Sequence, residues 1–401
     1  MRKVTLLGTR LPSFAAASET LAETLEVDLN TKRTERLTER IGTERVAERE
    51  VATAAFLALP LMEKLNVPLG VEAPDLACIS CDGGRMQRCD LPKNAKSHWC
   101  ETKVAILMRM RSKIHLCDPC PQVPDKFLDL AQMEQLTREI KGSTPSGSRF
   151  ERCQDPPPTP LEEITLEPVI AEAPEVLRRE VLASLADSER FGKQMAAQAW
   201  SLGFAKAARK VFIADGGSMN WGIWQREFRH QGYIPILDFI HALTYVFAAA
   251  LAGREAAEGR LIYLRWITWV WQGEVPRVIA ELSARVAELG AVPPDAAESD
   301  PRRIVSETLT YLTNQQSRMD YAYYRQMGYP ITSSHIESAV KQISRRVKGS
   351  EKFWTGRGGE ALLQLTADHL SDTKPMIQFW SRRARNQTGT KTYTPRKKTA
   401  A

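Results

Sequence analysis

The chain contains two copies of one short pattern, an apolar run that ends in Asp-Gly-Gly. The first copy is Cys78-Ile-Ser-Cys-Asp82-Gly83-Gly84 and the second is Val211-Phe-Ile-Ala-Asp215-Gly216-Gly217. Each apolar run predicts a buried strand with its carboxylate at the rim of a sheet, and the glycines allow close approach of a ligand. A single copy would be interpreted as a turn, because Asp-Gly is a common turn dipeptide. Two copies favour one site shared by Asp82 and Asp215.

The other apolar runs predict an α/β chain. Strands are expected over 103–110, 210–214 and 233–237, and helices over 126–140, 188–202 and 239–325, with Ser188 as the N-cap of the second helix. Residues 179–185 fit a strand or a helix. The segment 142–160 is rich in Pro, Gly and Ser and predicts a loop or linker. This mixture of strands and helices is typical of an α/β layout.

Residues 1–73 predict a small helical region. A short helix over 15–26 is separated by a break at Asp28 from a longer helix that begins at Thr31 and runs past Arg40. The pattern fits a DNA-binding helix-turn-helix, in which Arg33, Arg36 and Arg40 lie near one face of the second helix. A plain helical hairpin fits the same pattern.

Glu337 is the best candidate for a third acid beside Asp82 and Asp215. Two carboxylates suit a divalent cation with oxygen ligands, and a third would complete a pair of metal sites. Glu337 lies on a predicted helix that opens after Pro330, but Ser334-x-x-Glu337 is also a capping box, which is the competing interpretation. The helix has a buried stripe of Ile336, Val340, Ile343 and Val347, and an opposite face of Glu337, Lys341, Arg345 and Lys348.

Positive charge is concentrated near the end of the chain. Residues 338–401 hold 14 Lys+Arg and 4 Asp+Glu, a net charge of +10, which leaves 41 and 44, a net charge of −3, for the first 337 residues. A solvated tail is one interpretation of residues 376–401, and a polyanionic partner such as DNA is the other, because clustered cations neutralise phosphates. The cations expected to contact DNA are Lys341, Arg345, Arg346, Lys348, Arg33, Arg36, Arg40, Arg382, Arg383 and Arg385.

Membrane insertion and a disulfide framework are not expected. The longest apolar stretch, residues 234–252, carries Asp238 and His241, and a charge there is costly in lipid. The first residues carry no secretory signal pattern, and seven unevenly spaced cysteines do not suit disulfide pairing in a chain of 401 residues. A reducing cytoplasm is the expected compartment.

Several segments occur in an order that resembles one family of transposases. They are Asp82-Gly-Gly-Arg-Met-Gln, Ala214-Asp-Gly-Gly, Asn220-Trp221, Ile236-Leu-Asp-Phe-Ile-His241, Arg318-Met-Asp-Tyr, Pro330-Ile-Thr-Ser-Ser-His-Ile-Glu-Ser-Ala-Val-Lys-Gln, Arg346-Val-Lys-Gly and Lys352-Phe-Trp. Together they resemble the ISKra-type insertion-sequence transposases, relatives of the Mutator-type DDE enzymes. The resemblance covers roughly residues 14–380, and its combination of motifs is specific.

The resemblance implies a fold and a division of the chain. The fold would be a ribonuclease H-like mixed sheet core with an all-helical insertion, preceded by a small helical N-terminal region. The third core strand is placed near 180–185 by resemblance alone. The parts would be the N-terminal region over 1–73, the first part of the core over 74–252, the insertion over 253–325, the last part of the core over 326–375 and a basic tail over 376–401.

The resemblance also implies an activity. Asp82, Asp215 and Glu337 would hold two Mg²⁺ ions, which Mn²⁺ could replace, and Asp238 and His241 match a supporting D-x-x-H element. The reaction would be cleavage at insertion-sequence ends and transfer of the freed 3′-hydroxyl into target DNA. Double-stranded DNA would be the partner, bound by a homo-oligomer in the bacterial cytoplasm and nucleoid, and no nucleotide cofactor would be needed.

Two alternatives belong to other classes of protein. The N-terminal region is short for the family, which favours a truncated or repurposed protein that binds DNA without cleaving it. Cys117-Asp-Pro-Cys120 has zinc-knuckle spacing, with His98, Cys100, His115 and Cys153 as possible further ligands, and suggests a zinc-dependent nucleobase deaminase. That motif departs from the deaminase pattern, because the spacing between His98 and Glu101 is one residue too long and Leu116 precedes Cys117 in place of proline.

Overall fold

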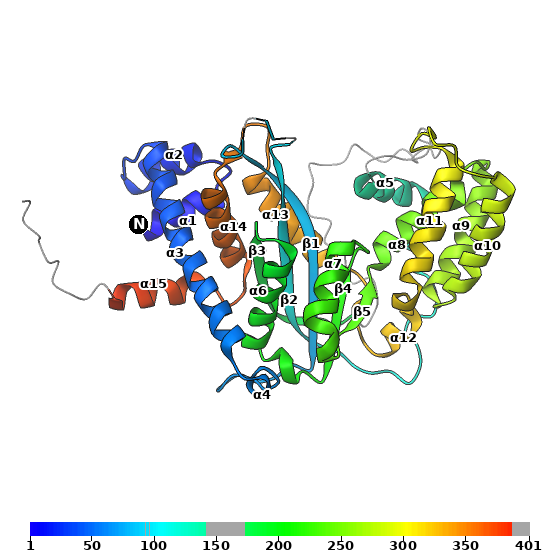
Figure 1. Ribbon diagram of the computed structural model, residues 1–401, viewed down its shortest axis with the longest axis horizontal. Coiled ribbons are helices and arrows are strands. Elements are labelled where there is room, and N and C mark those ends of the chain that lie inside the picture. The colour runs from blue at the N-terminus through cyan, green and yellow to red at the C-terminus, as the bar shows by residue number, and fades with distance from the viewer. Residues whose placement is uncertain (93, 96, 142–172, 387–401) are drawn as a thin grey trace, which may run out of the picture.

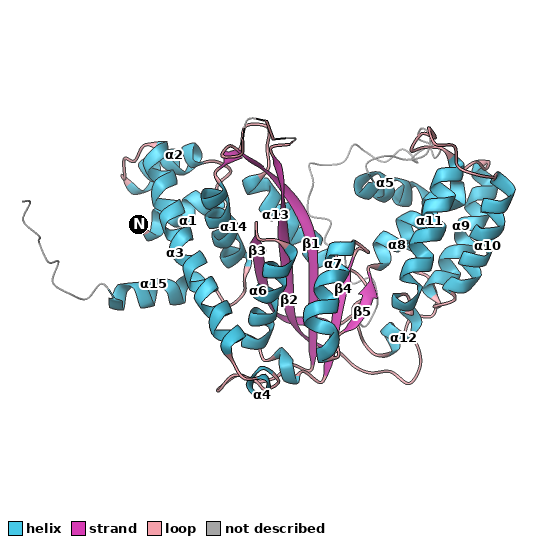
Figure 2. Cartoon of the chain, in the orientation of Figure 1, coloured by secondary structure: helices cyan, strands magenta, loops and turns pink. Residues whose placement is uncertain are grey.

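The computed structural model describes residues 1–92, 94–95, 97–141 and 173–386. The predicted loop 142–160 and residues 387–401 therefore lie outside the described residues. The chain is mixed α/β, as predicted. A six-stranded mixed sheet has helices on its faces, and a further group of helices lies beyond one edge of the sheet (Figures 1 and 2). In the described part of the chain, no helix has both the length and the apolarity needed to cross a bilayer.

The elements have the following bounds. The strands are β1 (Leu76–Arg88), β2 (Trp99–Arg111), β3 (Glu175–Ser184), β4 (Arg209–Ala214), β5 (Ile234–Leu237) and β6 (Phe353–Trp354). The helices are α1 (Arg2–Arg10), α2 (Phe14–Leu25), α3 (Thr31–Ala58), α4 (Leu61–Lys64), α5 (Leu130–Lys141), α6 (Ser188–Ser201), α7 (Ser218–Ile223), α8 (Phe239–Leu251), α9 (Ala256–Trp271), α10 (Val275–Leu289), α11 (Pro301–Gln315), α12 (Tyr321–Gln326), α13 (Ser334–Val347), α14 (Gly356–Leu370) and α15 (Pro375–Asn386).

The sheet has the strand order β3-β2-β1-β4-β5, and β6 pairs with the far end of β1. β2 is antiparallel to β1 and β3, whereas β4 runs parallel to β1 and β5. The predicted strands over 103–110, 210–214 and 233–237 are confirmed as β2, β4 and β5. The strand placed near 180–185 is β3, which begins five residues earlier. The first six residues of β1 are buried, because helices cover the sheet on both sides.

β1 does not end at Asp82, and this part of the sequence prediction was wrong. The strand continues through Gly83 and Gly84 to Arg88, because β2 pairs with it without a break from Leu76↔Met110 to Gln87↔Trp99. A twelve-pair antiparallel ladder outweighs the local turn preference of Asp-Gly. Asp215 behaves as predicted, because it follows the last residue of β4.

The predicted break between two N-terminal helices is confirmed. α2 ends before Glu26, which has φ +52°, and the side chain of Asn30 caps α3 by accepting the amide of Arg33. α3 is 28 residues long and packs against α14 and α6 at the β3 side of the sheet. A Cβ at Gly42 would lie 2.5 Å from the carbonyl oxygen of Ala361, so the two helix backbones are in direct contact there.

Two smaller predictions are corrected. The N-cap of α6 is Asp187, not Ser188, because the Asp187 side chain accepts the amide of Arg190. The basic tail expected from residue 376 instead begins as helix α15. Phe379 of α15 is 3% exposed and packs against Ile41 of α3, so this part of the chain is attached to the N-terminal helices.

The group of helices beyond β5 contains α8 to α12, as the predicted helical stretch 239–325 required (Figure 1). It includes α8, which the predicted boundary at residue 252 had assigned to the sheet part, and α5 packs against α8. The loop after β2 joins the same group. The buried Arg325 pairs with Asp118, and the Trp271 indole donates to the carbonyl of Cys120. One hydrophobic core runs through the sheet and these helices.

Candidate metal centre

The three predicted acids come from three different elements, and Asp82 interacts electrostatically with Asp215 and with Glu337. Within the described residues, the three do not form a group whose ligand atoms all lie within 4.8 Å of one another. Asp82 is in the middle of β1, Asp215 follows β4, and Glu337 is the fourth residue of α13. Burial and the negative charge of Asp215 raise the pKa of Asp82 to about 6. Burial also raises the pKa of Glu337, and the charges of Asp238 and Asp82 add to this effect. The fold therefore gathers negative charge in a partly buried place, which a cation would stabilise.

Each of the three acids keeps oxygen atoms that accept no hydrogen bond from the described residues. Asp82 accepts the Gly83 amide at 2.6 Å through Oδ1 only. Asp215 accepts through Oδ1 only, from the Gly217 amide at 2.9 Å and the Asn220 side chain at 2.8 Å. Asp82 Oδ2, Asp215 Oδ2 and both Glu337 oxygens remain available. Carboxylate oxygens are the ligands that Mg²⁺ prefers.

The turn that carries Asp215 is held from two sides. On the sheet side, Asn220 of α7 donates to Asp215 and accepts from the Cys81 thiol at 3.2 Å. On the helical side, the Tyr311 hydroxyl donates to the Asp215 carbonyl at 2.7 Å. Gly216 has φ +100°, which favours glycine at the turn. α7 and α11 thus fix the direction of the Asp215 side chain.

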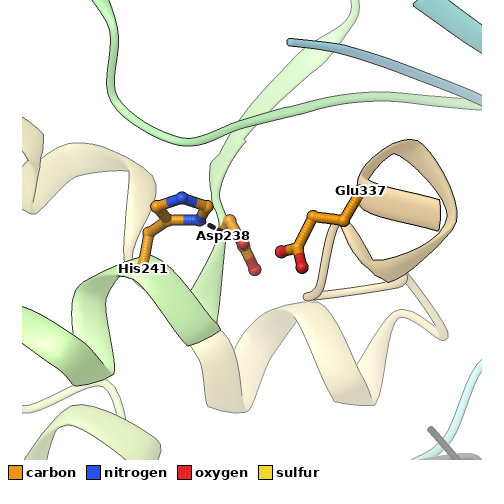
Figure 3. A group of neighbouring side chains, drawn as sticks. All are labelled: Asp238, His241 and Glu337. Atoms are coloured by element: carbon orange, nitrogen blue, oxygen red, sulfur yellow. Dashed lines mark hydrogen bonds and ion pairs between the residues drawn. The ribbon is translucent and has the colours of Figure 1, made fainter. Parts of the chain in front are cut away.

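Asp238, His241 and Glu337 bring potential ligand atoms within 4.8 Å of one another (Figure 3). Asp238, however, is fully buried and both of its oxygens are occupied. Oδ1 accepts the amides of Ile240 and Ser333, and Oδ2 accepts the His241 ring at 2.6 Å and the Ser333 hydroxyl at 2.7 Å. Asp238 is therefore a positioning group that joins α8 to the start of α13, and Glu337 is the member of this set that is free to bind a cation.

The capping-box interpretation of Glu337 is wrong. The N-cap of α13 is Ser333, which makes no side-chain cap hydrogen bond, and Ser334 is already the first helical residue. The Ser333 hydroxyl donates to Asp238 instead. Glu337 points from α13 toward Asp238, as Figure 3 shows.

His241 carries a positive charge at neutral pH. Burial lowers its pKa, but the hydrogen bond and charge of Asp238, with smaller effects of Asp215 and Glu337, raise the pKa to about 9. Burial would raise the pKa of Asp238, but the interactions with His241 and Ser333 hold it below its usual value. The imidazolium offsets part of the negative charge of the acids.

The charge on His241 predicts a pH dependence of stability in the metal-free protein. Because its folded pKa lies above the unfolded value near 6.5, the stabilisation is complete below about pH 6.5 and is lost as the pH rises through about 9. Urea unfolding in EDTA should show wild type more stable than His241→Gln at pH 6, with the difference shrinking by about 2–4 kcal/mol by pH 9.5. A difference independent of pH would mean that His241 is neutral in the folded state.

The cations predicted to contact DNA fall into two groups. Lys341 and Arg345 are exposed on α13, Lys348 is exposed directly after it, and Arg33 and Arg36 are exposed on α3. None of these five side chains belongs to an ion pair within the described ranges. Arg40, also exposed on α3, lies 3.4 Å from Glu44.

Three of the remaining predicted cations are engaged within the protein. Arg346 is 4% exposed, donates to the carbonyl of Gly8 and lies over the rings of Phe14 and Trp354. Its placement on a DNA surface is therefore wrong, because the guanidinium faces the protein interior, where burial lowers its pKa to about 10. On α15, Arg382 and Arg383 pair with Glu48 and Glu44 of α3. Arg385 is exposed.

The cysteines do not form a metal site among the described residues. Asp238, His241 and Glu337 are the group of potential ligands that comes together there, and it contains neither Cys117 nor Cys120. Cys153 lies outside the described residues. The zinc interpretation therefore gains no support.

Sequence reasoning missed the residues that position the acids. Asn220 lay in a recognised motif but had no assigned role, and Ser333 was considered only as part of the helix start. Tyr311 carries no sequence signal, because its partner is a backbone carbonyl 96 positions away. A cavity of 570 Å³ opens beside Asp215 and His241 and is lined by α8 and α11. Of the three acids, only Asp215 lines this cavity.

A scan of this chain against protein-family models finds no match, and a search of curated proteins finds no significant match.

Proposed function

We propose that this chain is a DNA transposase of the DDE class, built on a ribonuclease H-like core. The strand order and the positions of the acids on β1, after β4 and on α13 support the proposed core. The observation that carries the proposal is the set of three carboxylates with free oxygens, Asp82, Asp215 and Glu337, beside the unpaired cations of α13.

The donor set fits divalent metal ions. It offers only carboxylate oxygens, and the raised pKa values of Asp82 and Glu337 reflect a negative charge that a cation would relieve. Two Mg²⁺ ions held by Asp82, Asp215 and Glu337, or Mn²⁺ in their place, would polarise the scissile phosphate and lower the pKa of the attacking water.

The chain's own residues then orient the reaction. Asn220 and Tyr311 fix Asp215, and Asp238 fixes the start of the helix that carries Glu337. Lys341 and Arg345 on α13 would neutralise phosphates next to the acids.

In the first step, water attacks phosphorus and a 3′-hydroxyl leaves. In the second step, that hydroxyl attacks a target phosphodiester, so one bond forms for each bond broken and no nucleotide cofactor is needed. Exposed cations on α3 would hold the element ends, and a homo-oligomer would hold both ends together.

The test uses the full chain and the genomic DNA that flanks its coding sequence. Paired inverted repeats in these flanks would supply the substrate. Labelled duplexes carrying them should be cut in Mg²⁺ or Mn²⁺, leaving a 3′-hydroxyl, and should be joined to a target plasmid. EDTA should abolish both products. If the flanks bind but neither product forms with either metal, the protein is a DNA-binding protein without this activity.

A further inference from the structure

A groove opens on β1 directly after Asp82. It has a volume of 350 Å³, and Gly83 and Gly84 are among its lining residues. Arg85 of β1, Ser344 of α13 and Lys348, which directly follows α13, also line the groove. The lining therefore begins at the residue after the proposed metal ligand Asp82 and includes a residue from the C-terminal half of α13.

β1 has an open edge along this groove. On the side away from β2, β1 pairs with β4 only as far as Ser80, and it pairs with β6 only from Gln87 onward. The Arg88 amide donates to the carbonyl of His98, on the β2 side. Because successive amides of a strand point to opposite edges, the Gly83 and Arg85 amides point to the open edge. Gly83 donates to Asp82, so among the described residues the Arg85 amide is the backbone donor left at this open edge.

The groove has a net positive charge. Arg85 and Lys348 are exposed, and neither belongs to an ion pair among the described residues, although many arginines of this chain do. Glu101 is the acid that lines the groove, and it pairs with Lys103 at 2.9 Å. The two cations therefore retain the capacity to bind an anion from solvent.

The two glycines that line the groove differ in whether the surrounding protein leaves room for a side chain. A Cβ at Gly84 would lie 2.7 Å from the Thr102 hydroxyl, so Gly84 is required by the protein's own structure. A Cβ at Gly83 would meet only Glu101 Oε1, at an ordinary 3.5 Å. The protein has room for a side chain at residue 83, and the absence of one leaves this part of the groove open to a ligand.

We propose that this groove binds the sugar-phosphate backbone of the DNA strand next to the scissile phosphate. Arg85 and Lys348 bind phosphate oxygens, the Arg85 amide adds a neutral donor, and Gly83 allows close approach of the strand. The proposal rests on the proposed function for its position relative to the reacting phosphate, but the binding itself can be measured without cleavage.

The experiment measures binding of fluorescein-labelled dT20 to the full chain in EDTA by anisotropy over a range of salt concentrations. Arg85→Ala/Lys348→Ala removes two phosphate contacts and should lower the slope of log K against log salt by about 1.4. Gly83→Ala should weaken binding with an unchanged melting temperature. The control is Lys113→Ala/Lys206→Ala, which removes two exposed lysines at the opposite end of the sheet. Its slope should equal that of wild type.

Two outcomes separate the groove from the proposed function. If wild type cleaves DNA in Mg²⁺ but the Arg85/Lys348 double variant keeps the wild-type slope of log K against log salt, the proposal that the groove binds DNA is wrong and the proposed function stands. If neither wild type nor any variant cleaves DNA, but the salt-dependence slope decreases in the double variant and not in its control, the groove binds nucleic acid and the transposase proposal is wrong. A decrease of equal size in the slope of the control would also overturn the proposal that the groove binds DNA.

Discussion

Replacing Asp82 or Asp215 with Asn, or Glu337 with Gln, is expected to abolish DNA cleavage and strand transfer while DNA binding persists. Each change removes one negative charge and nearly preserves volume, and the free carboxylate oxygens are not needed for the fold. Loss of one charged ligand should lower the cleavage rate by roughly 10²–10³-fold or more, the scale seen when one charge-stabilising group leaves an active site. Both steps should fail together, because one site serves both.

Glu307→Gln is a suitable control for these three variants. Glu307 lines the cavity beside Asp215, but it is exposed and pairs with Arg303. The substitution changes the charge by the same amount near the site and should leave cleavage unchanged. Glu337→Gln is the decisive member of the set. If this variant cuts DNA at the wild-type rate in Mg²⁺, Glu337 is not a metal ligand and the proposed triad is wrong.

Direct binding of the metal gives a second measurement on the same variants. Titration of the DNA-free protein with Mn²⁺ should give two sites in wild type, and weaker or fewer sites in Asp82→Asn, Asp215→Asn and Glu337→Gln. Unchanged Mn²⁺ binding in all three variants would place the metal elsewhere.

Local sequence patterns were sufficient to predict β2, β4, β5 and the first half of β1, whereas β3 was placed by resemblance alone and the two-residue strand β6 was not predicted. Asp215 follows its strand as predicted, because the turn after β4 is short and local. Asp82 was misplaced relative to its strand, because its neighbours on β2 decide how far β1 extends, and a turn dipeptide carries no information about a partner strand. Pairing from residue 76 to residue 87 is a tertiary feature.

Contacts between distant parts of the chain explain the other errors. Arg346 was assigned to DNA together with Lys341, Arg345 and Lys348, yet helical spacing places it with Ala339 and Ile343 on the buried face of α13. That signal was present in the sequence. Its acceptor, the carbonyl of Gly8, is 338 positions away and could not be predicted. The same holds for Arg383 and Glu44, which are 339 positions apart and turn part of an expected tail into a docked helix.

Loss of the Asp238 side chain is expected to destabilise the folded state strongly. Its carboxylate is fully buried and accepts hydrogen bonds from Ile240, His241 and Ser333, of which Ser333 lies 95 positions away. Asp238→Ala would leave these donors unsatisfied, remove the N-cap of α8 and leave the His241 charge without its partner. Removing one member of a buried charged pair typically costs about 3–5 kcal/mol, and we expect a loss of this size in urea unfolding.

Asp238→Asn separates the structural effect from the chemical one. The Asn side-chain oxygen can still accept the Ile240 and Ser333 amides, so the start of α13 should be retained and the loss of stability should be smaller than with Ala. Its amide carries no charge, so the pKa of His241, measured by NMR, should fall from about 9. Cleavage should also decrease, because the position of Glu337 depends on the contact between Asp238 and Ser333. If Asp238→Ala unfolds at the same urea concentration as wild type, the hydrogen bonds of Asp238 do not hold the sheet and the α13 helix together, and the positioning role assigned to this residue is wrong.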